Sequence, residues 1–336
     1  MSTVMTMPAT MPVSEIMTAI AALAAEAGAG RWGVARADDV EPQEWERFQR
    51  WLAQGGHASM EYMERWGDIR RNPLRLLDEP SGAQGAGEAA AGSRAQGSVI
   101  SLAFSYYHEE RQLPSAARIA MYAHGDDYHE VLRRRLEPLA AWLRSLGYRA
   151  RICVDSAPIL ERYWAVKAGV GFVGRNRLLI VPGMGSYLFL AEVVTDAVLP
   201  ESEPLALTCG DCMRCVRACS GGALRCEGFD SAKCLSYLTI EHRGDLPAAV
   251  DSRPLAQAMG RKVYGCDACQ MVCPHNAGLA PTPIAEFHLR PALRTLTHAD
   301  ILALTPEAYS AIFAHSAAKR LRLAGLRRNA GAGKGN

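Results

Sequence analysis

Two short runs of cysteine near the middle of the chain are the residues best suited to bind metal. The first, at 209–220, reads CGDCMRCVRACS, and the second, at 266–274, reads CDACQMVCP. Nine of the ten cysteines lie between Cys209 and Cys273. The N-terminus has neither an Arg-Arg pair nor a basic stretch before its apolar residues, so we expect a cytoplasmic protein rather than an exported one. In that compartment clustered cysteines indicate metal before disulfides.

The spacing of the first run, C-x2-C-x2-C-x3-C, is that of bacterial ferredoxins with two [4Fe–4S] clusters. In those proteins three thiolates bind one cluster and the fourth reaches across to the other. With Cys273 as the reciprocal crossing ligand, one cluster is bound by Cys209, Cys212, Cys215 and Cys273. The other cluster then has Cys219, Cys266 and Cys269 and lacks one ligand.

Two cysteines compete for the missing position. Cys226 follows Cys219 by seven residues, and Cys234 opens the helical-looking stretch CLSYLTIE. The spacing alone leaves both open. Structural zinc also uses C-x2-C pairs, but a tetrahedral zinc site needs only four ligands, which two cysteine triplets with a C-x3-C-P ending fit poorly.

The rest of the chain must position these cysteines and give their electrons a destination. Helix-type apolar spacing covers about 16–77, and the stretch 81–97 has no apolar face and is expected to be a surface loop. Beyond it the pattern predicts strands at 98–107 and 148–155, a helix at 128–147 and a hairpin at 177–196 that turns at Gly183–Gly185. This alternation predicts an α/β layer with a mixed sheet.

The size of that layer argues against a simple electron carrier. About 200 residues precede the cysteines, far more than a ferredoxin needs. The hydrophobic fraction is 49% and the charged fraction 21%, without an apolar run long enough to span a membrane. The net charge is only +2, so any nucleic-acid surface must be local. We therefore expect an enzyme that accepts electrons from the clusters.

Several motifs together resemble the epoxyqueuosine reductase family. They are VDSAPILERYWAVKAGVGFVGRNRLLI at 154–180, the first cysteine run, CLSYLTIEHRG at 234–244 and YGCDACQMVCPHN at 264–276. The resemblance runs over nearly the whole chain except 81–97. It implies a cobalamin enzyme that reduces the epoxide of epoxyqueuosine, at the wobble position of tRNA, to the alkene of queuosine. It also selects Cys234 as the fourth ligand of the second cluster and leaves Cys226 aside.

The resemblance further implies the cofactors, partners and organisation. We expect base-off cobalamin without a histidine on cobalt, an external reductant of flavodoxin or ferredoxin type, a monomer, and no membrane contact. The expected parts are a cobalamin-binding catalytic α/β domain at 1–200, a two-cluster ferredoxin-like domain at 201–290 and a basic helical segment at 291–336. The alternatives are a cobalamin-dependent reductive dehalogenase and a non-catalytic ferredoxin-type carrier.

Site residues follow from the same motifs. Opening an epoxide leaves an alkoxide that must be protonated, and the resemblance places the proton donor at Asp155, which ends a predicted strand. Without the family, a lone Asp at this position is as readily a helix cap. The expected cobalamin contacts are Asp155, Arg162, Lys167, Gly174, Tyr128 and His129, and the expected tRNA contacts are Arg327 and Arg328. Glu161 and Arg162 are adjacent on the following helix, where a structural ion pair is the simpler interpretation.

Overall fold

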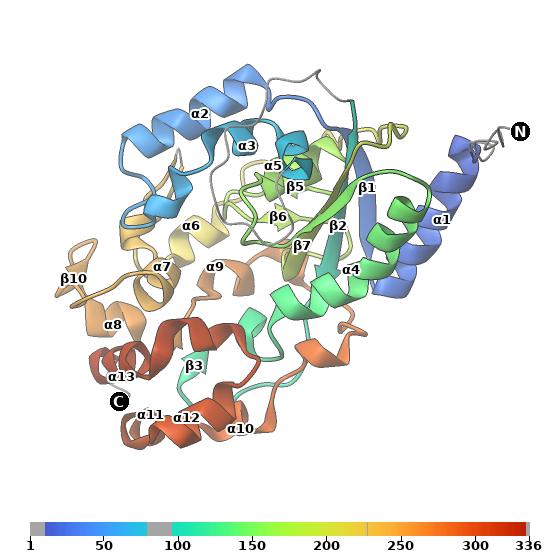
Figure 1. Ribbon diagram of the computed structural model, residues 1–336. Helices are drawn as coiled ribbons and strands as arrows, with labels where there is room; N and C mark the ends of the chain where they lie inside the picture. The colour runs from blue at the N-terminus through green and yellow to red at the C-terminus, as the bar shows by residue number, and fades with distance from the viewer. Residues whose placement is uncertain (1–10, 79–95, 227, 334–336) are drawn as a thin grey trace, which may run out of the picture.

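The structure, a computed structural model, describes residues 11–78, 96–226 and 228–333 (Figure 1). At its centre is a four-stranded sheet of order β1-β2-β7-β4, with every neighbouring pair antiparallel. Its strands are β1 Arg31–Arg36, β2 Ser98–Ser105, β4 Ala150–Cys153 and β7 Leu188–Thr195. The sequence predicts one sheet that contains both parallel and antiparallel pairs. In the structure the two kinds of pairing lie in different sheets. The parallel pair, β3 Arg118–Ile119 with β12 Lys262–Tyr264, forms a separate two-stranded sheet.

Helices cover both faces of the central sheet, which explains the continuous apolar sequence of β2. Ile100, Leu102 and Phe104 share a core with α1 Val13–Ala27 and α4 Tyr128–Ser145, which Figure 1 shows on the same side of the sheet. The alternate residues, among them Val99 and Ala103, pack in a second core with Trp164 of α5 Glu161–Lys167. Because successive side chains of a strand point to opposite faces, both sets must be apolar.

One strand was missed by the helix-type pattern expected over 16–77. That stretch contains α1, α2 Pro42–Ala53 and α3 Gly67–Arg71, but β1 lies between the first two helices. A Cβ at Gly33 of β1 would meet the carbonyl oxygen of Ala168 at 1.9 Å. This strand is therefore selected by close packing against the end of α5, a tertiary contact that periodicity cannot reveal.

The hairpin expected at 177–196 was wrong in its pairing and right in its turn. Gly183 and Gly185 have positive φ values of 78° and 70°, and Val181 bridges to Gly185. However, β6 Leu179–Ile180 pairs with β5 Phe172–Val173, while β7 leaves the turn to join the central sheet. The apolar residues of β7 on both faces suit a central strand better than a hairpin arm exposed on one side.

The cysteine-rich region has few and short regular elements, as the sequence predicts. Its helices are α6 Arg214–Ala218, α7 Leu235–Ile240, α8 Leu255–Met259 and α9 Ala268–Met271. Besides β12, its strands are β8 Leu224–Arg225, β9 Gly228–Phe229, β10 Ala249–Val250 and β11 Arg253–Pro254. Helices α6 and α9, which carry or precede cluster-type cysteines, pack against each other. Loops therefore present most of the thiols.

The C-terminal part is helical, as expected. It consists of α10 Pro291–Thr295, α11 His298–Ala303, α12 Pro306–Phe313 and α13 Arg322–Ala332. Their core also includes Ala117, Ile119 and Ala123, and Phe287 packs into the core beside α4. The packing thus interlocks segments across 1–200, 201–290 and 291–336, so those boundaries stay a prediction. Within the described ranges, every helix is too short or too polar to cross a membrane.

Truncation of a buried side chain of α4 should be costly, because this helix carries Tyr128 and His129. Leu132 is completely buried between α4 and the sheet. We expect Leu132→Ala to lower the free energy of unfolding by about 2–5 kcal/mol, measured by urea denaturation. The matched control is Leu302→Ala in α11, where the side chain is 49% exposed and the loss should stay within about 0.5 kcal/mol. Equal losses in both variants would contradict this packing.

Candidate active site

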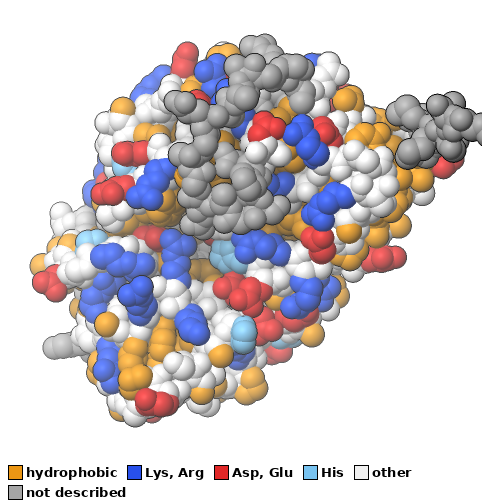
Figure 2. Space-filling view, in the orientation of Figure 1, with side chains coloured by type: hydrophobic (Ala, Val, Ile, Leu, Met, Phe, Trp, Pro, Cys, Tyr) orange, Lys and Arg blue, Asp and Glu red, His pale blue; other side chains and the backbone are white. Residues whose placement is uncertain are grey.

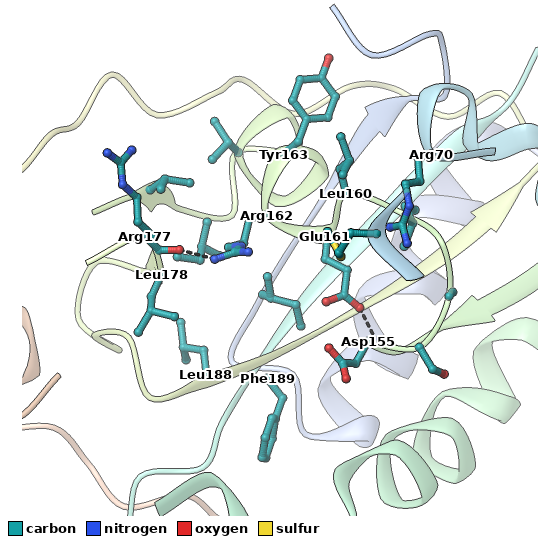
Figure 3. Close-up of a pocket in the computed structure, with 18 of the residues that line it drawn as sticks. Arg70, Asp155, Leu160, Glu161, Arg162, Tyr163, Arg177, Leu178, Leu188 and Phe189 are labelled. Atoms are coloured by element: carbon teal, nitrogen blue, oxygen red, sulfur yellow. Dashed lines mark hydrogen bonds between the residues drawn. The ribbon is translucent and has the colours of Figure 1, made fainter. Parts of the chain in front are cut away.

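A cavity of 2670 Å³ opens beside the carboxyl end of β4. Ordinary small-molecule pockets occupy roughly 300–1,000 Å³, so this one suits a much larger ligand. One wall carries Asp155 and Glu161, and Figure 3 shows these side chains close together with Leu188 and Phe189 beside them. A different wall carries four cysteines: Cys219, Cys234, Cys266 and Cys269. The cavity therefore joins the predicted proton donor to one predicted cluster.

Asp155 has a backbone conformation that a non-glycine residue rarely adopts. Its φ is 53°, two residues after the end of β4. The Asp155 N–H donates to Glu161 Oε1 at 2.5 Å, drawn as a dashed line in Figure 3. Such left-handed conformations persist only where surrounding contacts enforce them, and they are frequent at functional sites. Glu161 thus holds the backbone of Asp155, rather than forming the ion pair with Arg162 that the sequence indicated.

Two side chains of α4 hold the Asp155 carboxylate. Tyr128 Oη donates to Asp155 Oδ2 at 2.9 Å, and His129 Nε2 lies 3.0 Å from the same oxygen. On the other side of its ring, His129 Nδ1 lies 2.6 Å from Asp127 Oδ1. Asp127 also caps α4 by accepting from the His129 N–H. The start of the helix therefore fixes the ring of His129 between two carboxylates.

The charges in this arrangement follow from its contacts. Burial works to lower the pKa of His129, but the hydrogen bonds with Asp127 and Asp155 outweigh it and raise the pKa to about 9. Burial works to raise the pKa of Asp155, but His129 and Tyr128 hold it below its ordinary value. Burial raises the pKa of Tyr128 well above its ordinary value. At neutral pH, His129 is therefore protonated and Asp155 ionised.

Two further carboxyl groups lie behind Asp155 and carry little charge. Burial and the neighbouring charge of Asp155 raise the pKa of Glu161 to about 8. Glu192, fully buried on β7, accepts from Ser101 Oγ at 3.2 Å, and burial raises its pKa strongly. Cys153 pairs with Glu192 across the sheet and is buried, consistent with the core role that the sequence indicated. The sequence signal for Glu192 was a single carboxylate inside the apolar run LFLAEVV, and sequence reasoning overlooked it.

Of the other predicted cobalamin contacts, two line the cavity and one does not. Arg162 and Lys167 line it, whereas Gly174 supports the β5–β6 hairpin from behind. The Arg162 guanidinium donates to the Arg177 carbonyl oxygen (Figure 3), and burial lowers its pKa. Lys167 forms an ion pair of 2.5 Å with Glu41. A Cβ at Gly174 would meet Ile180 Cδ1 at 2.5 Å, so a larger residue there would require the Ile180 side chain to move.

Sequence reasoning missed two arginines of this cavity. Arg70 and Arg177 line it together with Arg162, and Figure 3 shows all three around it. Burial lowers the pKa of each guanidinium. Arginine stays protonated in proteins, so three partly desolvated cations at one cavity favour an anionic group of a ligand. Arg177 lies within the 154–180 motif without being singled out there, and Arg70 comes from a distant segment, so the sequence alone did not show that both reach the cavity.

The thiols fall into two groups that match the predicted ligand sets. Besides burial, Cys209 and Cys273 raise the pKa of Cys215, and Cys209 and Cys212 raise that of Cys273. Burial, together with the nearby Cys219, raises the pKa of Cys234. Burial, together with the nearby Cys234, raises the pKa of Cys266 to about 11. Burial and three neighbours, Cys266, Cys234 and Cys219, raise that of Cys269. Crowded thiolates that repel one another suit a cationic iron–sulfur core.

Cys226 belongs to neither group. It is exposed at the turn between β8 and β9, whereas Cys234 is at the start of α7 and lines the cavity. All ten cysteines are free, and in the part of the chain that is described no three His, Cys, Asp or Glu side chains converge tightly enough to bind a single metal ion. The choice of Cys234 made from the family resemblance is supported by this position and stays a prediction.

The predicted tRNA contacts lie on α13, away from the cavity. Arg327 donates to the Leu304 carbonyl oxygen, and Arg328 donates to the carbonyl oxygens of His242 and Gly244. Both guanidinium groups are therefore engaged within the chain. Arg320 is different, because it lines the cavity, forms an ion pair of 2.8 Å with Glu241 and is close enough to influence the pKa of Asp155.

Comparison with known proteins gives consistent family matches. A family model described as "Epoxyqueuosine reductase QueG, DUF1730" matches residues 93–156, and one described as "4Fe-4S double cluster binding domain" matches 208–276. An epoxyqueuosine reductase of Leadbetterella byssophila is 38% identical over 308 residues, covering 91% of this chain and 94% of that protein. Another, of Synechocystis sp., is 38% identical over 312 residues, covering 89% and 98%.

Solved structures agree with this result. A crystal structure of selenomethionine-labelled epoxyqueuosine reductase matches with a TM-score of 0.82 and 26% identity, covering 96% of this chain and 81% of that chain. A crystal structure of epoxyqueuosine reductase with an epoxyqueuosine-modified tRNA stem loop gives the same TM-score, identity and coverage. The fold of the described residues is therefore that of these enzymes.

Removal of single thiols distinguishes the two candidates for the fourth ligand. After reconstitution with iron and sulfide, Cys234→Ala should retain about four of eight irons per chain or lose the second cluster readily. Cys226→Ala, the matched control, should keep the full content because its side chain is exposed and apart from both groups. Iron and sulfide assays with electron paramagnetic resonance measure this. The reverse outcome would make Cys226 the ligand.

Proposed function

The chain belongs to the epoxyqueuosine reductase family, and we propose that it reduces the epoxide of epoxyqueuosine in tRNA to the alkene of queuosine. The observation that carries this proposal is the composition of one cavity, which has Asp155 on one wall and Cys219, Cys234, Cys266 and Cys269 on another. That arrangement lets proton delivery and electron delivery meet at one substrate. The family also favours a tRNA substrate over the reductive dehalogenase and electron-carrier alternatives.

The residues present fit cobalamin and two [4Fe–4S] clusters. The cavity is large and partly apolar, and Arg70, Arg162 and Arg177 offer positive charge to the phosphate of the corrinoid and hydrogen bonds to its amide side chains. Base-off binding is part of our proposal. When bound, cobalamin supplies a strongly reducing cobalt centre, and the clusters supply it with single electrons. The eight thiols in two groups provide the ligands that the clusters require.

The protein's own contribution to the reaction is to bring a proton to the epoxide oxygen. Reduction of an epoxide to an alkene and water consumes two electrons and two protons. Asp155 is ionised at neutral pH, so a proton that it delivers must first reach it from a neighbour. His129, with a pKa of about 9, gives up a proton more readily than Tyr128. We therefore assign Asp155 as the group that faces the substrate and His129 as its proton source.

The tRNA substrate requires a basic surface near the cavity. Figure 2 shows Lys and Arg side chains gathered at the lower left, where Figure 1 places α7, α8 and α13. Exposed basic residues of these elements and of the segment before α13 are Arg243, Lys319, Arg320, Arg322 and Arg327. Lys and Arg neutralise backbone phosphates, and bases of single-stranded loops are commonly splayed into pockets. We propose that this surface positions the anticodon arm. Arg327 and Arg328 are the tRNA contacts that the sequence predicts.

The function itself is tested by reconstitution. The chain loaded with iron, sulfide and cobalamin should convert epoxyqueuosine-containing tRNA to queuosine-containing tRNA in the presence of a chemical reductant, as shown by nucleoside mass spectrometry. A loaded chain that leaves this tRNA unchanged but removes halogen from aryl halides would support the dehalogenase alternative. A chain that takes up clusters but no corrinoid would support the carrier alternative.

Asp155→Asn removes the carboxylate and retains the shape and hydrogen bonding of the side chain. We expect turnover to fall by about 10²- to 10⁴-fold, the usual effect of losing a general acid, while cobalamin binding persists. Asp68→Asn is the control, because the Asp68 side chain is 84% exposed. Single-turnover conversion and the cobalamin absorption spectrum measure the two effects. Wild-type turnover in Asp155→Asn would remove this residue from the reaction.

The pH dependence of turnover reports on His129. Its pKa is raised from 6.5 to about 9 in the folded chain, so its proton is lost as the pH rises through about 9. We expect turnover to fall over that rise. Protonated His129 also stabilises the folded chain. This stabilisation is complete below about pH 6.5 and should be lost as the pH rises through about 9. In His129→Gln, turnover should be lower by roughly 10²-fold at neutral pH and should no longer fall with this pKa. An unchanged pH profile in the variant would exclude the relay.

A further inference from the structure

The two cysteine groups lie at different depths relative to the cavity. All four cysteines of the group formed by Cys219, Cys234, Cys266 and Cys269 line it. Among its described lining residues, none belongs to the group formed by Cys209, Cys212, Cys215 and Cys273. The second group therefore borders the reaction space, and the first group is the farther one. Cys209, Cys212 and Cys273 are half-buried, so an outside donor can approach the first group without entering the cavity.

Three chain segments meet around this outer group. Arg175, which follows β5, donates to the Gly210 carbonyl oxygen at 2.8 Å, between Cys209 and Cys212. The Phe172 ring contacts the His275 ring edge-on, with centroids 5.5 Å apart, next to the Cys273 segment. Helix α6, which carries Cys215, packs against α9. The β5–β6 hairpin, the 207–217 segment and the 271–276 segment thus form one surface, which we call the entry surface.

Exposed apolar side chains gather on the entry surface. Eight large hydrophobic side chains are exposed in the described part of the chain, and three of them belong to these segments: Met271, which lies outside the cavity, and Val173 and Leu207, which also border its rim. Met271 is 75% exposed, the highest value among the eight, and lies between Cys269 and Cys273 in the sequence. An exposed Met is adaptable and is common on surfaces that bind varied partners. These side chains offer a protein partner a small apolar contact.

The charge of the entry surface is strongly positive in a chain that is nearly neutral. Outside the cavity its segments contain Arg175, Arg214 and Arg217, while Arg177 lines the cavity, and Asp211 is the one carboxylate among 171–177, 207–217 and 271–277. Arg214 and Arg217 are exposed on α6, on either side of Cys215. The whole chain has a net charge of only +2. This local excess favours an acidic partner by charge complementarity.

We propose that the entry surface docks a small acidic one-electron carrier protein, which passes electrons to the cluster bound by Cys209, Cys212, Cys215 and Cys273. The proposal rests on the proposed function, because it assumes the two clusters. Each turnover consumes two reduced carriers, which are oxidised by one electron each. With two protons, these electrons convert the epoxide to an alkene and water. Charge guides the encounter, and the apolar residues make the contact.

Charge reversal on α6 tests the docking directly. The probe is a bacterial flavodoxin, an acidic flavin protein, and its affinity for the cluster-loaded chain is measured by calorimetry without tRNA. We expect Arg214→Glu with Arg217→Glu to weaken binding at low salt by roughly tenfold or more and to remove most of its salt dependence. The control is Arg294→Glu with Lys319→Glu, which changes net charge equally at exposed positions elsewhere. Equal affinities in both double variants would overturn the proposal.

Electron transfer gives an independent measurement with opposite expectations for two donors. In stopped flow, the Arg214→Glu, Arg217→Glu variant should oxidise flavodoxin hydroquinone roughly tenfold more slowly. It should accept electrons from the viologen radical cation as fast as, or faster than, the unaltered chain, because a cationic donor is attracted by the new charge. Unchanged oxidation of flavodoxin would contradict the proposal, as would equal slowing with both donors at full iron content.

Met271→Glu is a second variant that leaves both arginines in place. It adds negative charge to the same surface and should also weaken flavodoxin binding while iron content stays full. If it binds flavodoxin as tightly as the unaltered chain, the entry surface is elsewhere. Failure of the proposed function is seen separately, as unmodified epoxyqueuosine tRNA when the viologen drives the unaltered chain.

Discussion

The contact between the Asp155 N–H and the Glu161 carboxyl group is the constraint on which the site depends. It fixes a non-glycine residue at a φ of 53° at the point where β4 ends. Only from that conformation does the Asp155 carboxylate meet Tyr128 and His129 of α4 on one side and the cavity on the other. An ionised Glu161 would repel Asp155, and its raised pKa of about 8 means that burial keeps this carboxyl largely protonated at neutral pH. The sheet, α4 and α5 therefore hold the ionised Asp155 next to the largely protonated Glu161.

Much of the fold was readable from the sequence where the signal is local. The helix of α4 and the strand β2 have strong periodic or continuous apolar patterns. The cysteine spacing predicts seven of the eight thiol ligands, and only the family resemblance adds Cys234. The family resemblance predicts Asp155 as the proton donor, and the structure places it at the cavity. The strand β1 and the pairing of β6 were not predicted, because packing of Gly33 against Ala168 and competition between strands depend on residues distant in sequence. The same reason hid Arg70, Arg177 and the role of His129 as the partner of Asp155, since a contact between two elements leaves no mark in either one.

The arrangement of the thiols gives the chain a direction for electrons. Desolvation acts strongly in the group at the cavity, where it raises the pKa of Cys266 to about 11 and that of Cys269 further. A group that is both buried and crowded depends on a bound cationic core to become deprotonated. The outer group has less protein around it and arginines beside it. Separation of the two tasks follows: the outer group can be approached by a partner, and the inner group remains shielded from water beside the substrate.

If both proposals hold, the distribution of charge lets a nearly neutral chain bind two different anionic partners at once. The basic residues around α7 and α13 adjoin the cavity through Arg320, and those of α6 surround the outer thiols. Screening limits the reach of each exposed patch to roughly 8–10 Å at physiological salt. Two patches separated by more than that distance attract their partners independently. A polyanionic tRNA and an acidic electron carrier would otherwise compete for one basic face, so local patches of positive charge serve this reaction better than a high net charge.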